Sequence, residues 1–414
     1  MTTMTAGPLA RLSSEQLDAL GRELDSIHDE VFEDLGDRDR RYITSIVALH
    51  RRLVVLGRLL LIGSRRKPAW IAGTSLLSLG KILENMEIGH NVMHGQWDWM
   101  NDPQINSSTW DWDAASTAEA WKYAHNYIHH THTNILGKDR DLGYEIMRID
   151  PQQPWNPIYL LQPFYNVLLA AVFEWGVAMH DLDIGAIRRG EKSKAAAWHE
   201  LKGMGSKARR QVVKDYLAFP ALSGRRGFKK TVTANLTANV IRNVWAYMII
   251  FCGHFPDQTY SFTEQDVAGE TRGAFYVRQL LGSANIEGSA LFHVLSGNLG
   301  HQVEHHLFPD MPSTRYAEIA PRVKDLCERY ELPYNTGPLF KQLGMVQRTI
   351  LRLALPGGRP RPKPEPYHAG NGLSPPSPSS PPAAPVPDPG PTGPYGSGPE
   401  QPTDGVRVTL PDRG

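Results

Sequence analysis

Residues 121–134 read WKYAHNYIHHTHTN, a stretch that places four histidines within eight residues, at positions 125, 129, 130 and 132. Two similar clusters flank it in the chain, GHNVMHGQ at 89–96 and GHQVEHHLFP at 300–309. Each cluster contains two histidines four residues apart, a spacing that puts both imidazoles on one face of a helix. These pairs are His90/His94, His125/His129 and His301/His305. Two imidazoles on one face can share a metal ion, so the three clusters supply nitrogen donors for two metals.

Four other histidines stand alone and are interpreted as core or surface residues: His28, His50, His199 and His368. Clustered imidazoles differ from these, because each protonated neighbour raises the cost of leaving a ring without a metal or a hydrogen-bond partner. Imidazole suits zinc, copper, iron and nickel. A closed zinc site takes four ligands, whereas the clusters hold at least seven. Two irons, each with several imidazoles and an open position, fit this number.

The pattern HxxxH, HxxxHH and QxxHH resembles the three histidine boxes of the membrane fatty acid desaturase family. Its contexts are GHNVMHGQWDWMNDP, HHTHTN and NLGHQVEHHLFPDMP, within residues 40–335. The likeness is greatest to the acyl-CoA desaturases of actinobacteria. The resemblance implies an all-α integral membrane fold, with about four membrane-embedded helices and a cytosolic helical cap that carries a di-iron site.

The resemblance also implies a set of metal ligands. Those in the boxes are His90, His94, His125, His129, His130, His305 and His306. Gln302 takes the leading position of the third box, as in front-end desaturases, and His301 can replace it by its four-residue spacing from His305. His254 is the candidate for a ligand outside the boxes. Weaker candidates are His132, His180 and His293. Carboxylates and an amide that can orient the imidazoles are Glu87, Asp98, Asn134, Asp141 and Glu304.

By resemblance, the reaction is removal of two hydrogens from a long fatty acyl chain by O₂ and two electrons. The substrate is an acyl-CoA or a membrane lipid, with C16 or C18 and delta-9 as the expected length and position; Gln302 keeps a delta-6-type position open. A hydroxylase or ketolase with the same boxes is an alternative, and a histidine-rich zinc-binding membrane protein is a non-enzymatic one. The electrons are expected from an external NAD(P)H-linked reductase or ferredoxin-type partner, since no HPGG haem motif is present.

Composition argues against nucleic-acid binding and against metal sites with cysteine ligands. The 414 residues carry a net charge of +1, which gives no indication of nucleic-acid binding. The two cysteines, Cys252 and Cys327, cannot form a four-thiolate iron–sulfur cluster or a cysteine zinc site within one chain. The N-terminus has no apolar core of a cleavable signal peptide, so internal spans are expected to insert the protein. The expected location is the bacterial plasma membrane, with the active site on its cytoplasmic side.

Hydrophobic periodicity divides the chain into three parts. Residues 1–40 are expected to form a polar N-terminal region, with a helix capped by Ser14 and continuing to Leu35. Residues 41–355 form the membrane domain, and the Pro-rich residues 356–414 are expected to be disordered. The span candidates are 43–63, 69–89, 157–180 and 233–254. The first carries Arg51, Arg52 and Arg58, and is either a poor span or an interfacial helix.

A basic segment conflicts with this topology. Residues 181–232 hold 13 Lys/Arg against five Asp/Glu. All boxes must reach one metal site, so an even number of spans separates box two from box three. Two simple spans put the basic segment on the opposite side, against the positive-inside rule. Either the rule is overridden or part of 157–232 re-enters without crossing. The same charge also suits an acidic partner, anionic headgroups or coenzyme A phosphates.

Overall fold

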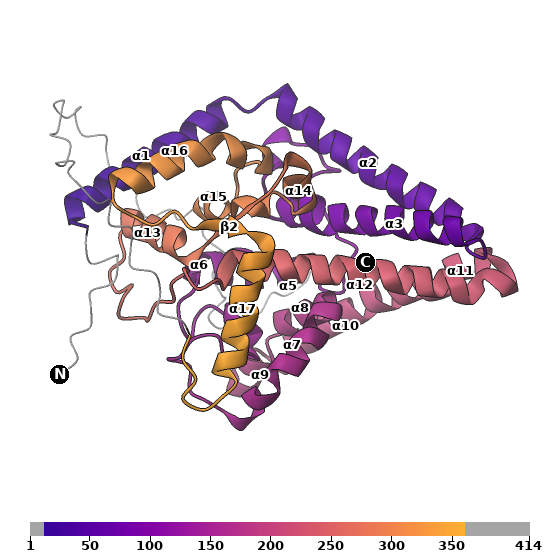
Figure 1. The fold of residues 1–414 in the computed structure, drawn as a ribbon. Coiled ribbons are helices and arrows are strands. Elements are labelled where there is room, and N and C mark those ends of the chain that lie inside the picture. Colours follow the sequence, from indigo (N-terminus) through magenta and orange to yellow (C-terminus); the bar gives the residue numbers. More distant parts are fainter. Residues whose placement is uncertain (1–11, 361–414) are drawn as a thin grey trace, which may run out of the picture. The chain divides into compact units, whose positions relative to one another are not determined.

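The computed structural model describes residues 12–360, and these are mostly helical (Figure 1). Two short strands, β1 Asn285–Glu287 and β2 Thr336–Pro338, pair in parallel. The predicted all-α class is therefore confirmed at the level of helix content. The first 11 residues and most of the predicted Pro-rich tail lie outside the described residues.

Two long helical hairpins form one end of this region. In the first, α2 (Asp37–Ile62) packs against α3 (Lys67–Leu83). A Cβ added at Gly73 would lie 3.0 Å from the Gly57 carbonyl oxygen, so the two helix backbones approach too closely for larger residues. In the second, α10 (Lys194–Val212), η7 (Val213–Ala218) and α11 (Phe219–Leu222) lead to a turn, and α12 (Gly224–His254) returns. The turn uses Gly224 at a φ of 69°, a conformation that favours glycine.

The three arginines of the first span candidate, 43–63, lie on α2 in two different environments. Arg58 is buried and donates to Asp215 (2.5 Å) and to Asn235 (2.6 Å), so its charge is paired inside the protein. Arg51 and Arg52 are exposed, one and a half turns or more before Arg58. Leucine and valine side chains dominate the exposed face of the last three turns of α2. Buried charges need such partners because an isolated charge loses its hydration.

The expectation of a spanning helix over 157–180 is wrong. This stretch folds as η6 (Pro157–Leu161), α7 (Gln162–Ala171) and α8 (Phe173–Asp181), and Val172 breaks the helix with φ −116° and ψ 29°. Neither α-helix reaches the ~20 residues that a span requires. Apolar side chains line an exposed face of α7, including Phe164 at 74% and Val167 at 68% exposure. That arrangement is typical of a helix lying at a membrane surface.

Within residues 12–360, α12 is the one helix that is long and apolar enough to cross a membrane by length and composition. The arrangement with about four embedded helices stays a prediction.

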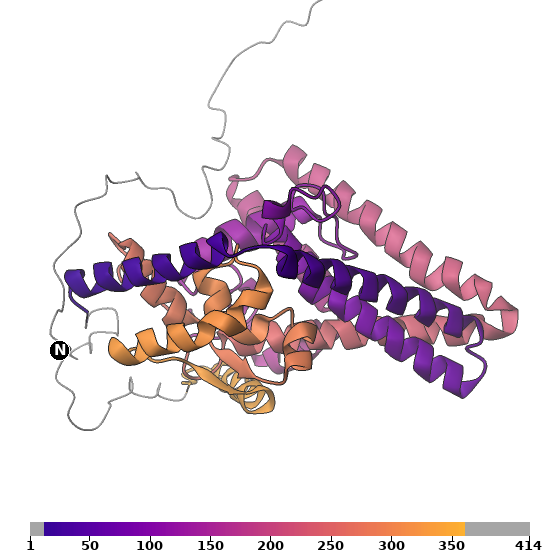
Figure 2. The ribbon, with the colours of Figure 1, turned by 90° about the horizontal axis from the view of Figure 1, so that it is seen from above.

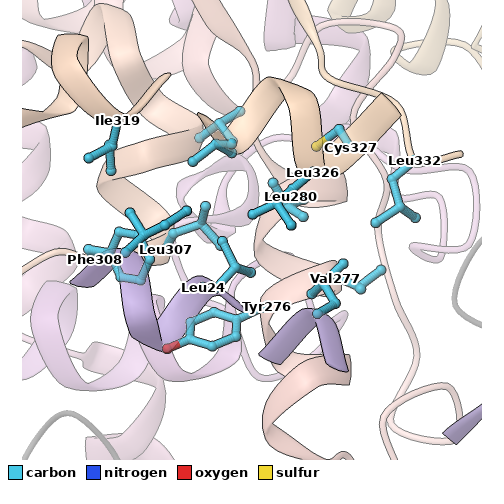
Figure 3. Close-up of a cluster of buried hydrophobic side chains, with 14 of the residues drawn as sticks. Leu24, Tyr276, Val277, Leu280, Leu307, Phe308, Ile319, Leu326, Cys327 and Leu332 are labelled. Atoms are coloured by element: carbon cyan, nitrogen blue, oxygen red, sulfur yellow. The ribbon is translucent and has the colours of Figure 1, made fainter. Parts of the chain in front are cut away.

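A group of four helices, here named the cap, packs at the other end around the side chains drawn in Figure 3. It combines α1 (Ser14–Glu33), α13 (Arg272–Gly282), α15 (Gln302–Leu307) and α16 (Tyr316–Arg329). α1 buries Leu20, Leu24 and Ile27. The N-cap residue of α1 is Ser13, one residue before the predicted Ser14, and its hydroxyl accepts a hydrogen bond from the Gln16 N–H at 3.2 Å. The helix ends at Glu33, two residues earlier than predicted.

The remaining elements are mostly short and connect the hairpins to the cap. They are η2 Glu84–His90, α4 Asn91–Met93, η3 Asp98–Met100, α5 Ala118–Trp121, η4 Lys122–His129, α6 His130–His132, η5 Leu142–Glu145, α9 Ile184–Arg189, α14 Ala290–Leu295, η8 Leu299–His301, η9 Ser313–Arg315 and α17 Leu339–Leu353. α3 and α12 both run from the hairpin turns toward the cap, so their C-terminal ends bring sequence-distant histidines together.

Candidate metal centre

Two π-helical segments carry the first two histidine clusters. η2 continues α3 and ends at His90, and η4 continues α5 and ends at His129. A π-helical turn is wider than an α-helical one and is frequently found at functional sites. The predicted pairing of imidazoles is confirmed in both segments: the ring centroids of His90 and His94 are 4.6 Å apart, and those of His125 and His129 are 5.1 Å apart.

Four histidines from all three clusters converge in a first histidine group. Its members are His90, His94, His125 and His305. One ring nitrogen from each lies within 4.8 Å of the others. Three of these residues are buried, and His125 is only slightly exposed. The group therefore offers four imidazole nitrogens around one point that is shielded from water.

A second histidine group joins three further rings, His129, His254 and His306, under the same distance limit. The Nε2 atoms of His254 and His306 are 3.2 Å apart. His254 is the last residue of α12, so this long helix delivers the ligand candidate outside the boxes. His130 lies between the two groups, with its ring centroid 4.7 Å from that of His94 and 4.5 Å from that of His306.

The unpartnered ring nitrogens fit metal binding. Both nitrogens of His94 and of His130, and the Nε2 atoms of His125 and His129, are buried without a hydrogen-bond partner. A buried polar atom without a partner is costly, and native structures contain few of them. One ring nitrogen each of His94, His125 and His129 lies within 4.8 Å of nitrogens on neighbouring imidazoles. Metal ions would satisfy these nitrogens, so the residues present fit a metal site.

Carboxylates hold the outer nitrogens of the second cluster. Asp139 lies 3.0 Å from Nδ1 of His129, and Asp141 lies 3.1 Å from Nδ1 of His125. Asp141 also contacts Nε2 of His180 at 2.9 Å. This carboxylate–histidine arrangement fixes the tautomer that leaves Nε2 free to bind a metal. Asp141 was among the predicted orienting residues, whereas Asp139 was not.

Residues from the cap hold the third cluster in the same way. The hydroxyl of Tyr316 lies 3.2 Å from Nδ1 of His305, and Oε1 of Gln279 lies 3.1 Å from Nδ1 of His306. Sequence reasoning missed both partners because neither belongs to a histidine cluster. Their positions depend on how α13 and α16 pack against α15.

Burial is the main influence on the pKa of the grouped imidazoles. It lowers the pKa of His94, His130 and His305 well below the usual value, and neighbouring imidazoles lower it further. These rings are therefore neutral at physiological pH, which is the form that binds a metal. Burial by itself raises the pKa of Asp141, but His129, His125 and His180 hold it well below its usual range, so this carboxylate is an anion.

Several predicted residues lie away from both groups. His301 stacks on His293, with ring centroids 4.3 Å apart, and it belongs to neither group. His132 is also outside them. Among the orienting candidates, Glu304 binds Tyr334 and Asn285, and Asn134 donates to the carbonyls of Tyr260 and Gly282. Asp98 accepts from Ser107, and Glu87 accepts from Tyr42, Ser313 and Asn298.

Gln302 lies against the second group instead of His301. Its Nε2 is 3.1 Å from Nε2 of His254, and its Oε1 is buried without a hydrogen-bond partner. We expect Gln302→Ala to lower activity by about 10–100-fold, as the loss of a group that holds a metal site does. His301→Ala should change activity by less than about threefold, because its ring contacts His293 and belongs to neither histidine group.

Turnover and bound metal of these two variants, measured side by side, test this assignment. Gln302→His, which restores a nitrogen donor at the same position, should keep activity. The reverse pattern, with His301→Ala inactive and Gln302→Ala active, would place His301 at the metal.

Asp141 offers a second prediction, because its two oxygens serve two different imidazoles. Asp141→Asn leaves one acceptor oxygen and removes the charge, so we expect metal affinity to fall by about 10–100-fold. The measurement is metal retained by the purified protein during dialysis against increasing chelator. Asp98→Asn is the matched control, since Asp98 contacts Ser107 and no histidine of either group. Equal retention by both variants would remove Asp141 from the support of the site.

A buried cavity opens beside the first histidine group. His90 and His125 line one end, and aromatic and aliphatic side chains from residues 112–144, α8 and α12 line its walls. These include Trp112, Trp121, Tyr144, Phe173, Val177 and Ile250. Polar side chains also line the cavity: Asn85, Asp141, Glu174, His180, Asp181 and Asn243. The arrangement suits a largely apolar molecule held with one segment against the imidazoles.

Comparisons with known proteins agree with this geometry. A family model described as fatty acid desaturase matches residues 68–338. A protein of Mycobacterium tuberculosis named NADPH-dependent stearoyl-CoA 9-desaturase is 51% identical over 84% of this chain and 82% of its own length. An sn-1 linoleoyl-lipid 6-desaturase of Synechocystis sp. is 26% identical over 66% of this chain and 77% of its own. An acyl-lipid (8-3)-desaturase of Mortierella alpina is 24% identical over 61% and 56%, respectively.

Proposed function

The chain belongs to the fatty acid desaturase family, and on that premise we propose that it introduces a cis double bond at carbon 9 of a C16 or C18 acyl-CoA. The observation that carries this proposal is the apolar cavity, which ends at His90 and His125 of a buried histidine group. The 51% identity to a stearoyl-CoA 9-desaturase supports the substrate and the position.

Two irons are the metals that the ligand set suits best. The first histidine group would hold one iron, the second histidine group with Gln302 would hold the other, and His130 can serve either. The bound irons supply the reduction of O₂ that makes an unactivated C–H bond reactive. Neutral imidazoles leave the positive charge of the metals uncompensated, which favours an oxidising centre.

The protein's own contribution is to position the acyl chain and exclude water. Trp112, Phe173 and Ile250 bind methylenes along the cavity, so that one methylene pair rests beside His90 and His125. Asp139 and Asp141 accept the outer N–H of His129 and His125, which fixes the tautomer whose Nε2 is left for the metal. Tyr316 does the same for His305. Each of these contacts preserves the geometry of the metal ligands while a substrate enters and leaves.

The electrons come from a separate protein in this proposal. The chain's two cysteines are both buried and are too few for an iron–sulfur cluster. The Mycobacterium tuberculosis relative is named as NADPH-dependent. We therefore infer an NADPH-linked reductase or a ferredoxin-type donor, which reaches the histidine end from the cytoplasm. The hairpins lie in the plasma membrane, and the acyl-CoA enters from the same cytoplasmic side.

A front-end desaturase is the second candidate, favoured by the position of Gln302 beside His254 and by the likeness to a lipid 6-desaturase. One experiment separates the candidates: the chain is expressed with a compatible reductase, and host fatty acids are separated by gas chromatography with double-bond location. A new delta-9 monoene is the expected product. A delta-6 product would favour the second candidate, and a product heavier by one oxygen atom would indicate a hydroxylase. A protein that binds zinc and no iron would overturn the proposal.

A further inference from the structure

The hairpin turns farthest from the histidines carry a basic patch. It consists of Arg65, Arg66, Lys67, Arg225, Arg226, Lys229 and Lys230, all of them exposed. Hydrogen bonds join the two turns: the hydroxyls of Ser64 and Thr231 are 2.9 Å apart, and Trp70 Nε1 donates to the Lys230 carbonyl at 2.9 Å. Figures 1 and 2 both show the turns side by side, at the end of the long helices opposite the cap. Seven cations from two segments therefore form one surface.

Nothing in the surrounding sequence neutralises this patch. Residues 40–83 and 216–256 contain no Asp or Glu. Asp215, the acidic residue that precedes the second stretch, is buried and bound by Arg58 and Lys81. No ion pair between described residues involves any of the seven cations. A patch of this density raises the local concentration of anions and favours a negatively charged partner.

The structure thus divides the basic segment 181–232 into two parts with different partners. Near the histidine end, Lys207 and Arg210 pair with Asp111, and Lys214 pairs with Asp113. Four cations in the first two turns of α12, in contrast, are exposed at the opposite end: Arg225, Arg226, Lys229 and Lys230. The cations of segment 181–232 that conflict with the positive-inside rule are therefore those of the patch.

The distance between the patch and the histidines matches the thickness of a bilayer. Lys230 and His254 are 24 positions apart on α12, which corresponds to about 36 Å along the helix axis. The hydrocarbon core of a bilayer is about 30 Å thick. Apolar side chains are exposed between these ends, among them Leu59 of α2 and Leu236 of α12. A bilayer around these side chains places the patch at headgroup level, in the leaflet opposite the histidines.

We propose that the basic patch binds the phosphate groups of anionic phospholipids in that leaflet. Arginine guanidinium groups pair with phosphate oxygens in a bidentate geometry, and lysines add point charges. Exposed Ile62, Ile71 and Leu222 lie next to the cations along the chain, so a bound lipid finds apolar contacts beside the charged ones. The indole N–H of Trp70 already donates to the Lys230 carbonyl, and tryptophan is enriched at membrane–water interfaces. An acidic protein would match the charge of the patch, but it would not match the exposed apolar side chains next to it.

This proposal needs the hairpins to lie in a membrane, and it is independent of the reaction at the histidine end. The test uses the full-length protein in a neutral detergent, with thermal unfolding followed during titration with short-chain phosphatidylglycerol or phosphatidylcholine. We expect phosphatidylglycerol to stabilise the protein at concentrations at least about tenfold lower than phosphatidylcholine. Inorganic phosphate, titrated as a third probe, should not reproduce the effect, because it lacks the acyl chains.

A variant with Arg225, Arg226, Lys229 and Lys230 all changed to Gln should lose this preference, with an apparent affinity for phosphatidylglycerol at least about tenfold lower. The control changes four exposed cations outside the patch to Gln, namely Arg22, Arg41, Lys324 and Lys341, which removes the same charge and should keep the preference. If the first variant does not fold, Arg65→Gln, Arg66→Gln and Lys67→Gln in the other turn test the same surface. Equal stabilisation by both lipids, an equal loss in the control, or full stabilisation by inorganic phosphate would overturn the proposal.

Discussion

His305→Ala should abolish desaturation while the protein remains folded in the membrane. The His305 ring is fully buried, its Nδ1 contacts Tyr316 at 3.2 Å, and its Nε2 lies 3.4 Å from Nε2 of His90. It is therefore the member of the third cluster that completes the first histidine group. Loss of a residue that merely orients a ligand costs about 10–100-fold, so loss of the ligand should cost at least about a thousandfold in turnover. Iron content should fall together with the activity.

The matched control for this experiment is His132→Ala. His132 belongs to the densest histidine cluster, is half-buried and lies outside both groups, so its loss should leave iron and turnover near wild type. Product analysis and iron per chain are measured on both variants in the same membranes. Wild-type turnover in the His305→Ala variant would remove this residue from the metal site.

Arg242→Leu should destabilise the protein by about 3–5 kcal/mol, the usual cost of leaving one member of a buried ion pair alone. Arg242 sits in the middle of α12 and pairs with Glu174 of α8, and both side chains are almost fully buried. Gln211 also donates to Glu174 at 2.6 Å, but an amide cannot compensate a full charge. The thermal unfolding midpoint of the detergent-solubilised protein measures the effect.

The double variant, Arg242→Leu with Glu174→Leu, is the informative companion. Replacing a whole buried pair with apolar residues is often neutral, so most of the lost stability should return. A single variant as stable as wild type would mean that the pair contributes nothing to the packing of α8 on α12. A double variant no better than the single one would mean that the shape of the arginine matters more than its charge.

The sequence by itself determined the family, the helical class and most of the candidate site. These properties are local or nearly so: histidines four residues apart share a helix face wherever that helix is placed, and the three clusters carry the family pattern in their own residues. The assignment to the fatty acid desaturase family is confirmed by the family model and by the 51% identical relative. His90/His94 and His125/His129 do face each other, although the helix is π-helical where η2 and η4 lead into these pairs.

In the third cluster, the rule that histidines four residues apart share one helix face fails. His301 has φ −103° and ψ 55°, outside the helical region, and α15 begins at the next residue. The four-residue spacing to His305 therefore does not cross a continuous helix, and the His301 ring turns toward His293 while Gln302 faces His254. A similar break at Val172 divides the apolar stretch 157–180, because hydropathy averages over a helix without revealing its ends.

Only the tertiary structure decided which groups converge. His254 joins His129 and His306 because α12 ends beside these two residues, and no spacing in the sequence contains that information. Asp139 reaches His129 through the turn that follows box two. The two hairpin turns that carry the basic patch meet because hairpins of similar length lie side by side. Each of these contacts depends on helix length and packing between segments more than 100 residues apart or on turn geometry, and those are properties of the folded chain.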